Sequence, residues 1–443
     1  MVGRWLVSAV VVVAVPTVAT AAEGGLRAHP LSAAPFGLLL AAVAILPLVA
    51  GHWWHKNRNK AIVAAGCAIP AAIYVLTKAG GRAALGHELE GYVSFIVLLT
   101  ALYTISGGVV LSGHLRPTSA VNVGFLATGA LLANVIGTTG ASMLLVRPLL
   151  RINAQRSRRA HVPVFFIFVV SNTGGLLTPL GDPPLFLGFL QGVPFDWTLG
   201  LWPQWLMVNG ALLVVFAVWD RRADRVDKPN AFHPAKVGPT GPLRLEGWKW
   251  NLPLMLGVAG VVLAKTLVPF PFGELGMLGL TGLSLAKTAK PLREANGFSW
   301  GPMAEVAILF AGIFVAMVPA LALLEEHGGK AGITRGWQFF WLTGCLSSLL
   351  DNAPTYVSMA TLAAGGNGLG WLATERPGLL AAISCGAVFM GGNSYIGNGP
   401  NFMVKAIAEE NGYAMPSFGR YMLVAAMVLF PVFGLVTLVF FRE

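Results

Sequence analysis

The chain has 443 residues, of which 55% are hydrophobic and 11% charged, and 30 Lys+Arg against 19 Asp+Glu leave a formal net charge of +11. Soluble domains carry about 25% charged residues, whereas here apolar runs near the roughly 20 residues that cross a bilayer fill most of the length. The composition excludes a soluble enzyme, a secreted disulfide scaffold and a disordered chain. It predicts an all-α polytopic membrane protein. The basic excess in its loops is an orientation signal for the cytoplasmic side rather than a sign of nucleic-acid binding.

Residues 1–22 have the layout of a signal peptide. Arg4 precedes an apolar stretch, and Ala19-Thr20-Ala21 forms a small-residue cleavage site, as in secretory signals. The alternative is an uncleaved first helix. Residues 23–91 then hold two N-terminal spans, joined by a basic loop that includes Lys60 and is expected in the cytoplasm.

The first of two expected repeats covers residues 92–219. After a span at Tyr92–Ser112 comes an apolar stretch, residues 117–150, with arginines before and after it. Both ends therefore carry the cytoplasmic signature, although the stretch is long enough to cross the membrane. We expect a re-entrant hairpin whose tip lies at residues 134–140, which are small and polar enough to leave the helix and line a cavity.

A broken helix follows this hairpin, at SNTGGLLTPLGDPP (residues 171–184). Glycines, three prolines and an aspartate cannot lie within one continuous lipid-facing helix, because proline removes hydrogen bonds and the freed carbonyls need partners. A span at Leu201–Trp219 ends the repeat. Residues 220–249 form a basic loop, expected in the cytoplasm, that begins at Asp220, and His161 also falls at the edge of a polar segment.

The second half of the chain shows the same order of features. Residues 250–300 hold two connecting spans, and residues 301–443 hold a span, an apolar stretch interrupted at residues 351–355, a broken segment at residues 391–401 and a final span. We expect two inverted repeats, each with a re-entrant hairpin and a broken transmembrane helix, in about 10 spans plus 2 hairpins after the signal peptide.

The repeat rests on nearly constant spacing between separate motifs. Asn134 and Asn352 are 218 positions apart, the Gly-Gly pairs that begin at residues 174 and 391 are 217 apart, and Gly181 and Gly397 are 216 apart. The loop charges and the number of crossings place the first hairpin opening in the cytoplasm and the second outside. This inverted organisation is typical of secondary transporters, which bind substrate and coupling ions at mid-membrane.

Two aspartates, Asp182 and Asp351, lie inside the predicted breaks. A carboxylate at the bilayer centre is costly unless it is paired or hydrated, so both are candidate ion-binding residues and a Na+ ion is possible at either. The alternative is that each caps a half-helix, and the two roles are compatible. For Glu305, a helix-start position favours a structural role.

Neutral oxygens and amides accompany both acids. Hard oxygen ligands suit Na+, or protons on carboxylates, better than a soft metal. No catalytic residue and no cofactor is expected, with sodium and proton serving as coupling ions. The candidate substrate- and ion-binding residues beside the acids are Asn352, Thr355, Ser171, Asn172, Thr173, Asn134, Thr138, Thr139, Gly392, Asn393, Ser394, Asn398 and Asn401.

The motif at 171–184 resembles the signature of the ion-transporter superfamily, which includes arsenite permeases, sodium/proton antiporters and dicarboxylate symporters. The likeness is strongest to a bacterial family labelled both citrate transporter and sodium/proton antiporter. It implies an inverted-repeat fold, often a homodimer, that works by an elevator-like movement. The sequence departs from the dicarboxylate symporters at the first hairpin tip, where Asn134-Val135-Ile136 replaces Ser-Asn-Thr.

These features indicate a secondary transporter rather than an enzyme, with a channel as one alternative. A nucleotide-driven pump would need a GxxxxGK[ST] loop, which this sequence lacks. The first hypothesis is sodium/proton antiport by alternating access, in which Asp182 and Asp351 bind Na+ (or Li+) and H+ in turn. The second is cation-coupled transport of citrate or another organic anion, held by half-helix N-termini and helped by Lys405. Arsenite efflux is a third, on resemblance alone.

Overall fold

The computed structural model describes residues 26, 28–227, 241–264, 267–327 and 332–442. The predicted signal peptide and the middle of the basic loop lie outside these residues. The chain divides into two compact units, each described by itself. The smaller unit comprises the chain up to Val97 together with Gly301–Glu326. The larger unit comprises Leu98–Trp300 together with the chain from His327 onward.

Within the described residues, seven helical segments are long and apolar enough to cross a membrane. One of them doubles back on itself, and three shorter apolar segments accompany them. The protein is therefore a multi-pass helical membrane protein, as the composition predicts. The seven segments are Pro30–Val49, Asn57–Leu76, Gly81–Ser106, Ser119–Ile152, Phe195–Arg225, Gly301–His327 and Phe418–Phe440.

The smaller unit is a group of packed helices. Lys60 of α4 is 3% exposed and forms an ion pair of 2.9 Å with Glu305 of α13, so this lysine is buried in the unit rather than free in a loop. The expected structural role of Glu305 agrees with this pair. Phe95 stacks on Phe310 with ring centroids 4.8 Å apart. The elements are η2 (Pro30–Ala33), α2 (Ala34–Val49), α3 (Gly51–Trp54), α4 (Asn57–Leu76), most of α5 (Gly81–Ser106) and α13 (Gly301–His327).

The larger unit contains both interrupted regions. Its first part comprises β1 (Val110–His114), α6 (Ser119–Ile152), α7 (His161–Val169), η3 (Thr173–Leu176), α8 (Pro183–Leu190), η4 (Phe195–Leu201) and α9 (Trp202–Asp227). Its connecting part comprises β2 (Gly241–Glu246), α10 (Trp248–Leu263), α11 (Phe272–Lys287) and α12 (Lys290–Ala295). Its last part comprises α14 (Gly336–Leu349), α15 (Asn352–Ala364), α16 (Leu369–Glu375), α17 (Pro377–Met390), η8 (Gly391–Asn393), α18 (Gly399–Glu410) and α19 (Phe418–Phe440).

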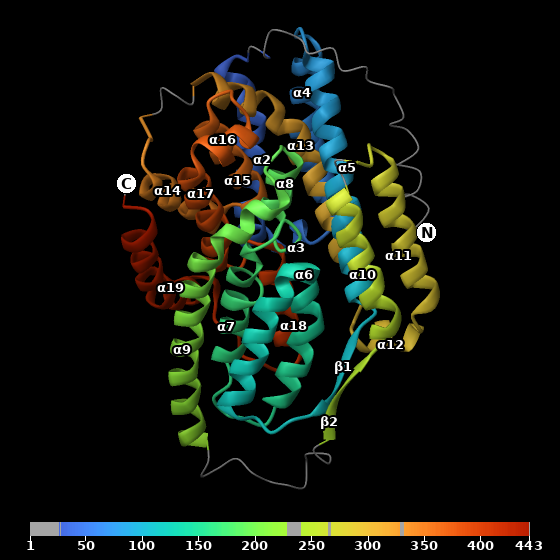
Figure 1. Ribbon diagram of the computed structural model, residues 1–443, viewed down its shortest axis with the longest axis vertical. Helices are drawn as coiled ribbons and strands as arrows, with labels where there is room; N and C mark the ends of the chain where they lie inside the picture. Colours follow the sequence, from blue (N-terminus) through green and yellow to red (C-terminus); the bar gives the residue numbers. More distant parts are fainter. Residues whose placement is uncertain (1–25, 27, 228–240, 265–266, 328–331, 443) are drawn as a thin grey trace. The chain divides into compact units, whose positions relative to one another are not determined.

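Helix α6 is a hairpin that folds back at Gly137, as expected for this stretch. Gly137 has φ 76° and ψ 156°, which interrupts the helix. The Asn122 and Asn153 side chains hydrogen-bond each other at 2.7 and 3.0 Å. In a straight helix these residues would lie roughly 46 Å apart along the axis. Figure 1 shows the two halves of α6 as neighbouring teal helices.

The other predicted interruptions also fall where helices end. Helix α7 gives way to η3, an irregular turn and then α8, and helix α17 gives way to η8, a second turn and then α18. The apolar stretch of the second half is divided between α14 and α15, which contact each other across Leu350 and Asp351. Each expected break is therefore present.

The described residues are mainly helical, as expected, and one feature was not expected: β1 and β2 form a two-stranded antiparallel sheet (Figure 1). Val110 pairs with Glu246 and Ser112 with Arg244. Helix α5 accordingly ends at Ser106 rather than at Ser112, and α9 continues past Trp219 to Asp227. Strand pairing between segments so distant in the chain leaves no local pattern in the sequence.

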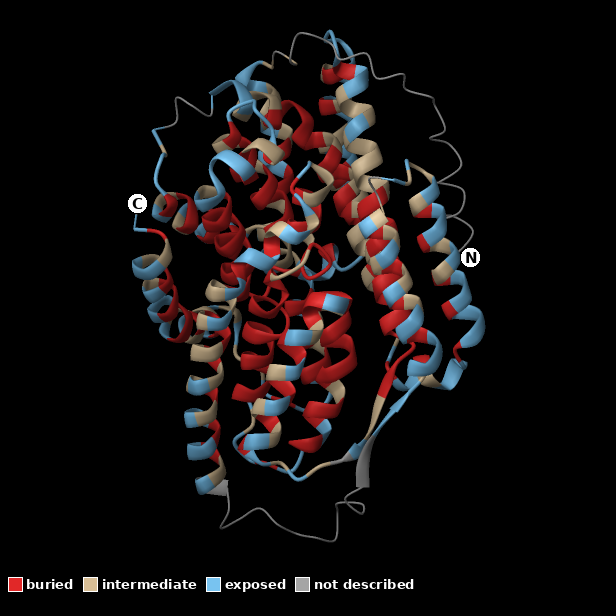
Figure 2. Cartoon of the chain, in the orientation of Figure 1, coloured by how far each residue is buried: buried red, intermediate tan, exposed pale blue. Residues whose placement is uncertain are grey.

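The burial pattern separates interior helices from those with an outward face. Every residue of α7 is buried, whereas α9 and α19 alternate buried and exposed residues along their length (Figure 2). The exposed residues of α19 include Leu423, Met427 and Leu438. Apolar side chains on an outward face suit contact with lipid.

Candidate functional site

Asp182 is the centre of the candidate site. Its side chain is buried, with the residue 1% exposed. Carboxylate Oδ1 accepts hydrogen bonds from Thr138 Oγ1 at 2.8 Å and Asn398 Nδ2 at 3.0 Å, and Oδ2 accepts from Asn352 Nδ2 at 2.5 Å. We call Asp182, Thr138, Asn352 and Asn398 the Asp182 site. All four were predicted from the sequence, and they come from four separate helical segments of the larger unit.

Each of these residues lies at the N-terminal end of a half-helix. Asp182 is the N-cap of α8, Asn398 is the N-cap of α18, Asn352 is the first residue of α15, and Thr138 begins the second half of α6. Helix N-termini carry a partial positive charge from their free N–H groups. They offset part of the cost of burying the Asp182 carboxylate, whose hydrogen-bond donors are all neutral.

Glycine and proline residues make this convergence sterically possible. The Thr138 N–H donates to the Gly181 carbonyl at 2.8 Å, just after the positive φ of Gly137. A Cβ on Gly181 would collide with the Gly175 carbonyl oxygen. Pro183 opens α8 immediately after Asp182, at a position where a missing N–H removes no helical hydrogen bond.

A further hydrogen-bond network connects the two broken regions behind Asp182. Asn398 Nδ2 also contacts the Ser171 carbonyl at 3.0 Å and Asn172 Oδ1 at 3.3 Å. Asn172 Nδ2 donates to Asn401 Oδ1 at 2.7 Å, and Asn401 Nδ2 donates to the Ser394 carbonyl at 2.9 Å. Four more predicted residues are thus joined to the site by buried polar contacts.

The two breaks share local contacts, in a register that differs slightly from the sequence alignment. Thr138 lies against the turn at residues 175–181, and Asn352 lies against the turn at residues 391–397. By these contacts Thr138 holds the place that Asn352 holds in the other half. The sequence alignment instead paired Asn134 with Asn352, two identical residues that lie on opposite sides of their breaks.

Asp351 has different surroundings. It is the N-cap of α15, is half-buried, and its Oδ1 accepts the Ala353 N–H at 3.1 Å. The Thr355 hydroxyl donates to the Asp351 carbonyl at 2.8 Å, within the same helix. These contacts are the capping role that the sequence left open, and neither residue hydrogen-bonds Asp182 among the described contacts.

The remaining predicted residues hold the breaks in place. Asn134 Oδ1 accepts the Leu177 N–H at 2.8 Å, and Asn393 Nδ2 donates to Ser348 Oγ at 2.8 Å. Ser394 Oγ accepts the Gly397 N–H at 3.1 Å. Thr139 is half-buried beside Thr138.

Residues from neighbouring spans support the breaks, and the sequence analysis missed them. Asn209 of α9 accepts from the Thr173 hydroxyl at 2.8 Å. Trp205 Nε1 donates to the Gly174 carbonyl at 2.8 Å, and Tyr421 of α19 donates its hydroxyl to the Gly392 carbonyl at 2.8 Å. An asparagine within the apolar span Leu201–Trp219 was the one local signal of this support.

Ser142 was also missed. Its hydroxyl lies 2.8 Å from the Ser171 hydroxyl, so the second half of α6 contacts the start of the first break. Both side chains are buried.

Two buried oxygens in this region, Asn352 Oδ1 and Asn393 Oδ1, have no hydrogen-bond partner among the residues that the structure describes. Leaving a buried acceptor unsatisfied costs about 1–3 kcal/mol. One carboxylate with nearby amide and hydroxyl oxygens is a donor set for a hard cation or a proton. The described residues contain no group of three or more His, Cys, Asp or Glu that could hold a metal ion.

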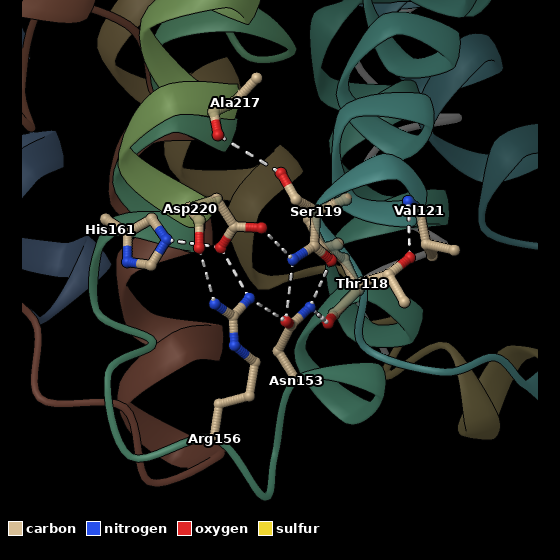
Figure 3. Close-up of polar contacts among 10 residues, drawn as sticks. Thr118, Ser119, Val121, Asn153, Arg156, His161, Ala217 and Asp220 are labelled. Atoms are coloured by element: carbon tan, nitrogen blue, oxygen red, sulfur yellow. Dashed lines mark hydrogen bonds and ion pairs between the residues drawn. The ribbon is translucent and has the colours of Figure 1, made fainter. Parts of the chain in front are cut away.

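The larger unit contains a second buried cluster of polar and charged side chains (Figure 3). From the sequence, its charged residues were expected in polar loops. Asp220 Oδ1 contacts Arg156 Nη1 at 2.6 Å and His161 Nε2 at 2.8 Å, and Asp220 Oδ2 accepts from Asn122 at 3.1 Å. Arg156 also donates to Asn153 at 3.1 Å. The cluster joins both open ends of the α6 hairpin to α7 and α9.

Comparison with known proteins indicates that this chain is a transport protein. A family model described as "Putative citrate transport" matches residues 27–441, which is nearly the whole chain. An uncharacterized transporter of Synechocystis sp., slr0753, is 24% identical over 333 residues, covering 63% of this chain and 68% of that protein.

Proposed function

Because the chain belongs to this citrate-transport family and is a multi-pass membrane transporter, we propose that it is a secondary active transporter that exchanges Na+ for H+ at the Asp182 site. The observation that carries the proposal is a buried carboxylate whose three hydrogen-bond donors are all neutral. Such a group can be neutralised by a proton or by a small cation, but not by both at once. Binding of one ion therefore expels the other, which is the requirement for antiport.

Alternating access would follow from the organisation of the larger unit. The matching contacts of the two breaks support two repeats of one structural plan. If the repeats are inverted, as the loop charges indicate, the Asp182 site lies near the bilayer midplane between them. We also propose that the protein lies in the bacterial cytoplasmic membrane and forms a homodimer, as the family resemblance implies.

A second candidate function is cation-coupled transport of citrate, which the family description favours. The half-helix N-termini around Asp182 would attract a carboxylate group of the substrate once a cation or proton neutralises Asp182. Lys405, the basic residue expected to help, forms an ion pair of 2.9 Å with Glu409 instead. The absence of a lysine, arginine or histidine from the donors to Asp182 places citrate second.

Proton movement in proteoliposomes separates these functions. Vesicles that carry an inside-acid pH gradient are challenged in turn with Na+, Li+, K+ and citrate. We expect Na+ or Li+ alone to dissipate the gradient, whereas vesicles without protein show no response. If cations alone have no effect and labelled citrate accumulates only when Na+ is present, the antiport proposal is wrong and citrate symport replaces it.

A further inference from the structure

We propose that Asp182 is the single exchangeable carboxylate of this transporter, so that one cation replaces one proton in each cycle, and that Asn352 serves it as a reversible amide ligand. This inference rests on the proposed cation/proton exchange. It adds the stoichiometry of the exchange and names the residue that responds to the ion.

The first argument is the number of carboxylates at the site. Asp182 receives three hydrogen bonds from neutral side chains of three other segments. Among the described residues, Asp351 is the acidic residue close enough to act electrostatically on Asp182. The Asp351 carboxylate, however, is half-buried and caps its own helix through the Ala353 N–H, outside the four residues of the Asp182 site. Asp182 is thus the one carboxylate of that site, and one carboxylate binds one proton or one monovalent cation.

The second argument is the Asn352 side chain. Its Nδ2 donates to Asp182 Oδ2 at 2.5 Å, while its buried Oδ1 has no hydrogen-bond partner within the described part of the chain. This orientation suits an ionised, empty Asp182. A half-turn of the amide exchanges donor and acceptor. The Oδ1 atom would then accept from a protonated Asp182 or coordinate a bound Na+.

The third argument is the position of Asn398. It is the counterpart of Asp182 in the second break, since each residue is the N-cap that follows a glycine turn. Its Nδ2 lies 3.0 Å from Asp182 Oδ1, so the polar ends of the two side chains are in direct contact. A carboxylate moved from residue 182 to residue 398 would therefore still reach the same ion.

The first test uses the wild-type protein. Sodium uptake and proton release are measured together in proteoliposomes, with a potential-sensitive dye present. One carboxylate predicts one proton per Na+ and no change in membrane potential. A ratio of two protons per Na+, or a potential that develops during exchange, overturns the inference and leaves the antiport function intact. No cation-driven proton flux at all refutes the antiport function itself.

The second test moves the acid. We expect Asp182→Asn to reduce Na+-driven proton flux by at least about 100-fold, and Asp182→Asn with Asn398→Asp to recover about tenfold over that single variant. Asp351→Asn should retain one-to-one exchange, because asparagine caps a helix as well as aspartate does. Asp196→Asn, an exposed acid of η4, is the control substitution.

The inference is overturned if Asp351→Asn loses more exchange than Asp182→Asn. A folded, monodisperse Asp351→Asn protein that loses exchange, or a folded Asp182→Asn protein that keeps it, assigns the proton to Asp351 or to another group. If Asp182→Asn fails to fold, the wild-type stoichiometry still decides the matter.

Discussion

Asp182 and Asp220 are both buried carboxylates of the larger unit, and the groups around them differ in kind. Asp220 contacts a guanidinium and an imidazole at 2.6 and 2.8 Å, whereas Asp182 contacts one hydroxyl and two amides. A carboxylate compensated by fixed basic side chains gains little from a further cation. A carboxylate compensated only by dipoles remains available to a proton or Na+. Our proposal that Asp182 exchanges ions and that Asp220 is structural rests on this difference.

The structural role of Asp220 can be measured by Asp220→Asn. We expect this variant to lose about 3–5 kcal/mol of stability, because removing one partner of a buried ion pair leaves the other charge uncompensated. Thermal unfolding of the purified protein in detergent measures the loss. The matched control is Glu409→Gln, which removes an exposed pair with Lys405 and should change stability by less than about 1 kcal/mol.

An unfolding temperature for Asp220→Asn that equals the control would show that the cluster in Figure 3 does not stabilise the larger unit. The sequence did not indicate this cluster, since Arg156, His161 and Asp220 each fall at the edge of a polar segment. Their pairing depends on the return of α6 and on α9 continuing past Trp219. Asp182 and Asn352, in contrast, were identifiable because polar residues within apolar segments are rare and costly.

At the scale of elements, the fold of the larger unit depends on helices that end inside apolar segments, where an uninterrupted helix would otherwise be expected. The hairpin tip is the clearest case, because Gly137 has φ 76° and ψ 156°, a region that side chains other than glycine rarely adopt. The turn at this glycine lets the Thr138 N–H donate to the Gly181 carbonyl and the Thr138 hydroxyl donate to Asp182.

Gly137→Ala is expected to destabilise the protein by about 1–3 kcal/mol, since alanine is strained in this conformation. A Cβ there would also lie 3.2 Å from the Leu180 carbonyl oxygen. Gly124→Ala, in the same helix, is the matched control, because its Cβ would meet nothing within 4 Å and alanine favours helix. Equal unfolding temperatures for the two variants would contradict a hairpin tip whose backbone conformation requires glycine.

The supports of the breaks give a prediction about transport. Tyr421→Phe removes the hydrogen bond to the Gly392 carbonyl, and we expect a several-fold loss of transport as the break loses its position. Tyr92→Phe removes an equivalent bond of 2.8 Å to the Ala307 carbonyl in the smaller unit. Both variants should lose similar stability, about 1 kcal/mol. Equal transport rates in the two variants would show that Tyr421 has no positioning role.

Much of the element plan was predictable because interruption has a strong chemical signature. Glycine and proline combined with aspartate or asparagine within apolar segments located both broken helices, and the small, polar tip located the α6 hairpin. The two-stranded sheet was not predictable, because β1 pairs with a segment more than 100 residues away. The register between the halves was displaced because identical residues, Asn134 and Asn352, occupy opposite sides of their breaks.

At the scale of the whole molecule, the proposed inverted topology can be tested by labelling. The open end of the first hairpin is at Gln155, and the chain enters α14 after Thr334; both residues are exposed. With the three native cysteines replaced by alanine, we expect Gln155→Cys to react with a membrane-impermeant reagent only from the cytoplasmic side. Thr334→Cys should react only from the outside. Reaction of both residues from the same side would contradict the inversion.

The most direct test of ion exchange at Asp182 is the binding of radioactive sodium to the purified protein as a function of pH. Competition between one proton and one Na+ predicts that sodium affinity falls about tenfold for each pH unit on the acid side. Asp182→Asn should bind no sodium at any pH, and Asp196→Asn should match the wild type. Sodium binding that is independent of pH, or that survives in a folded Asp182→Asn protein, would contradict the account.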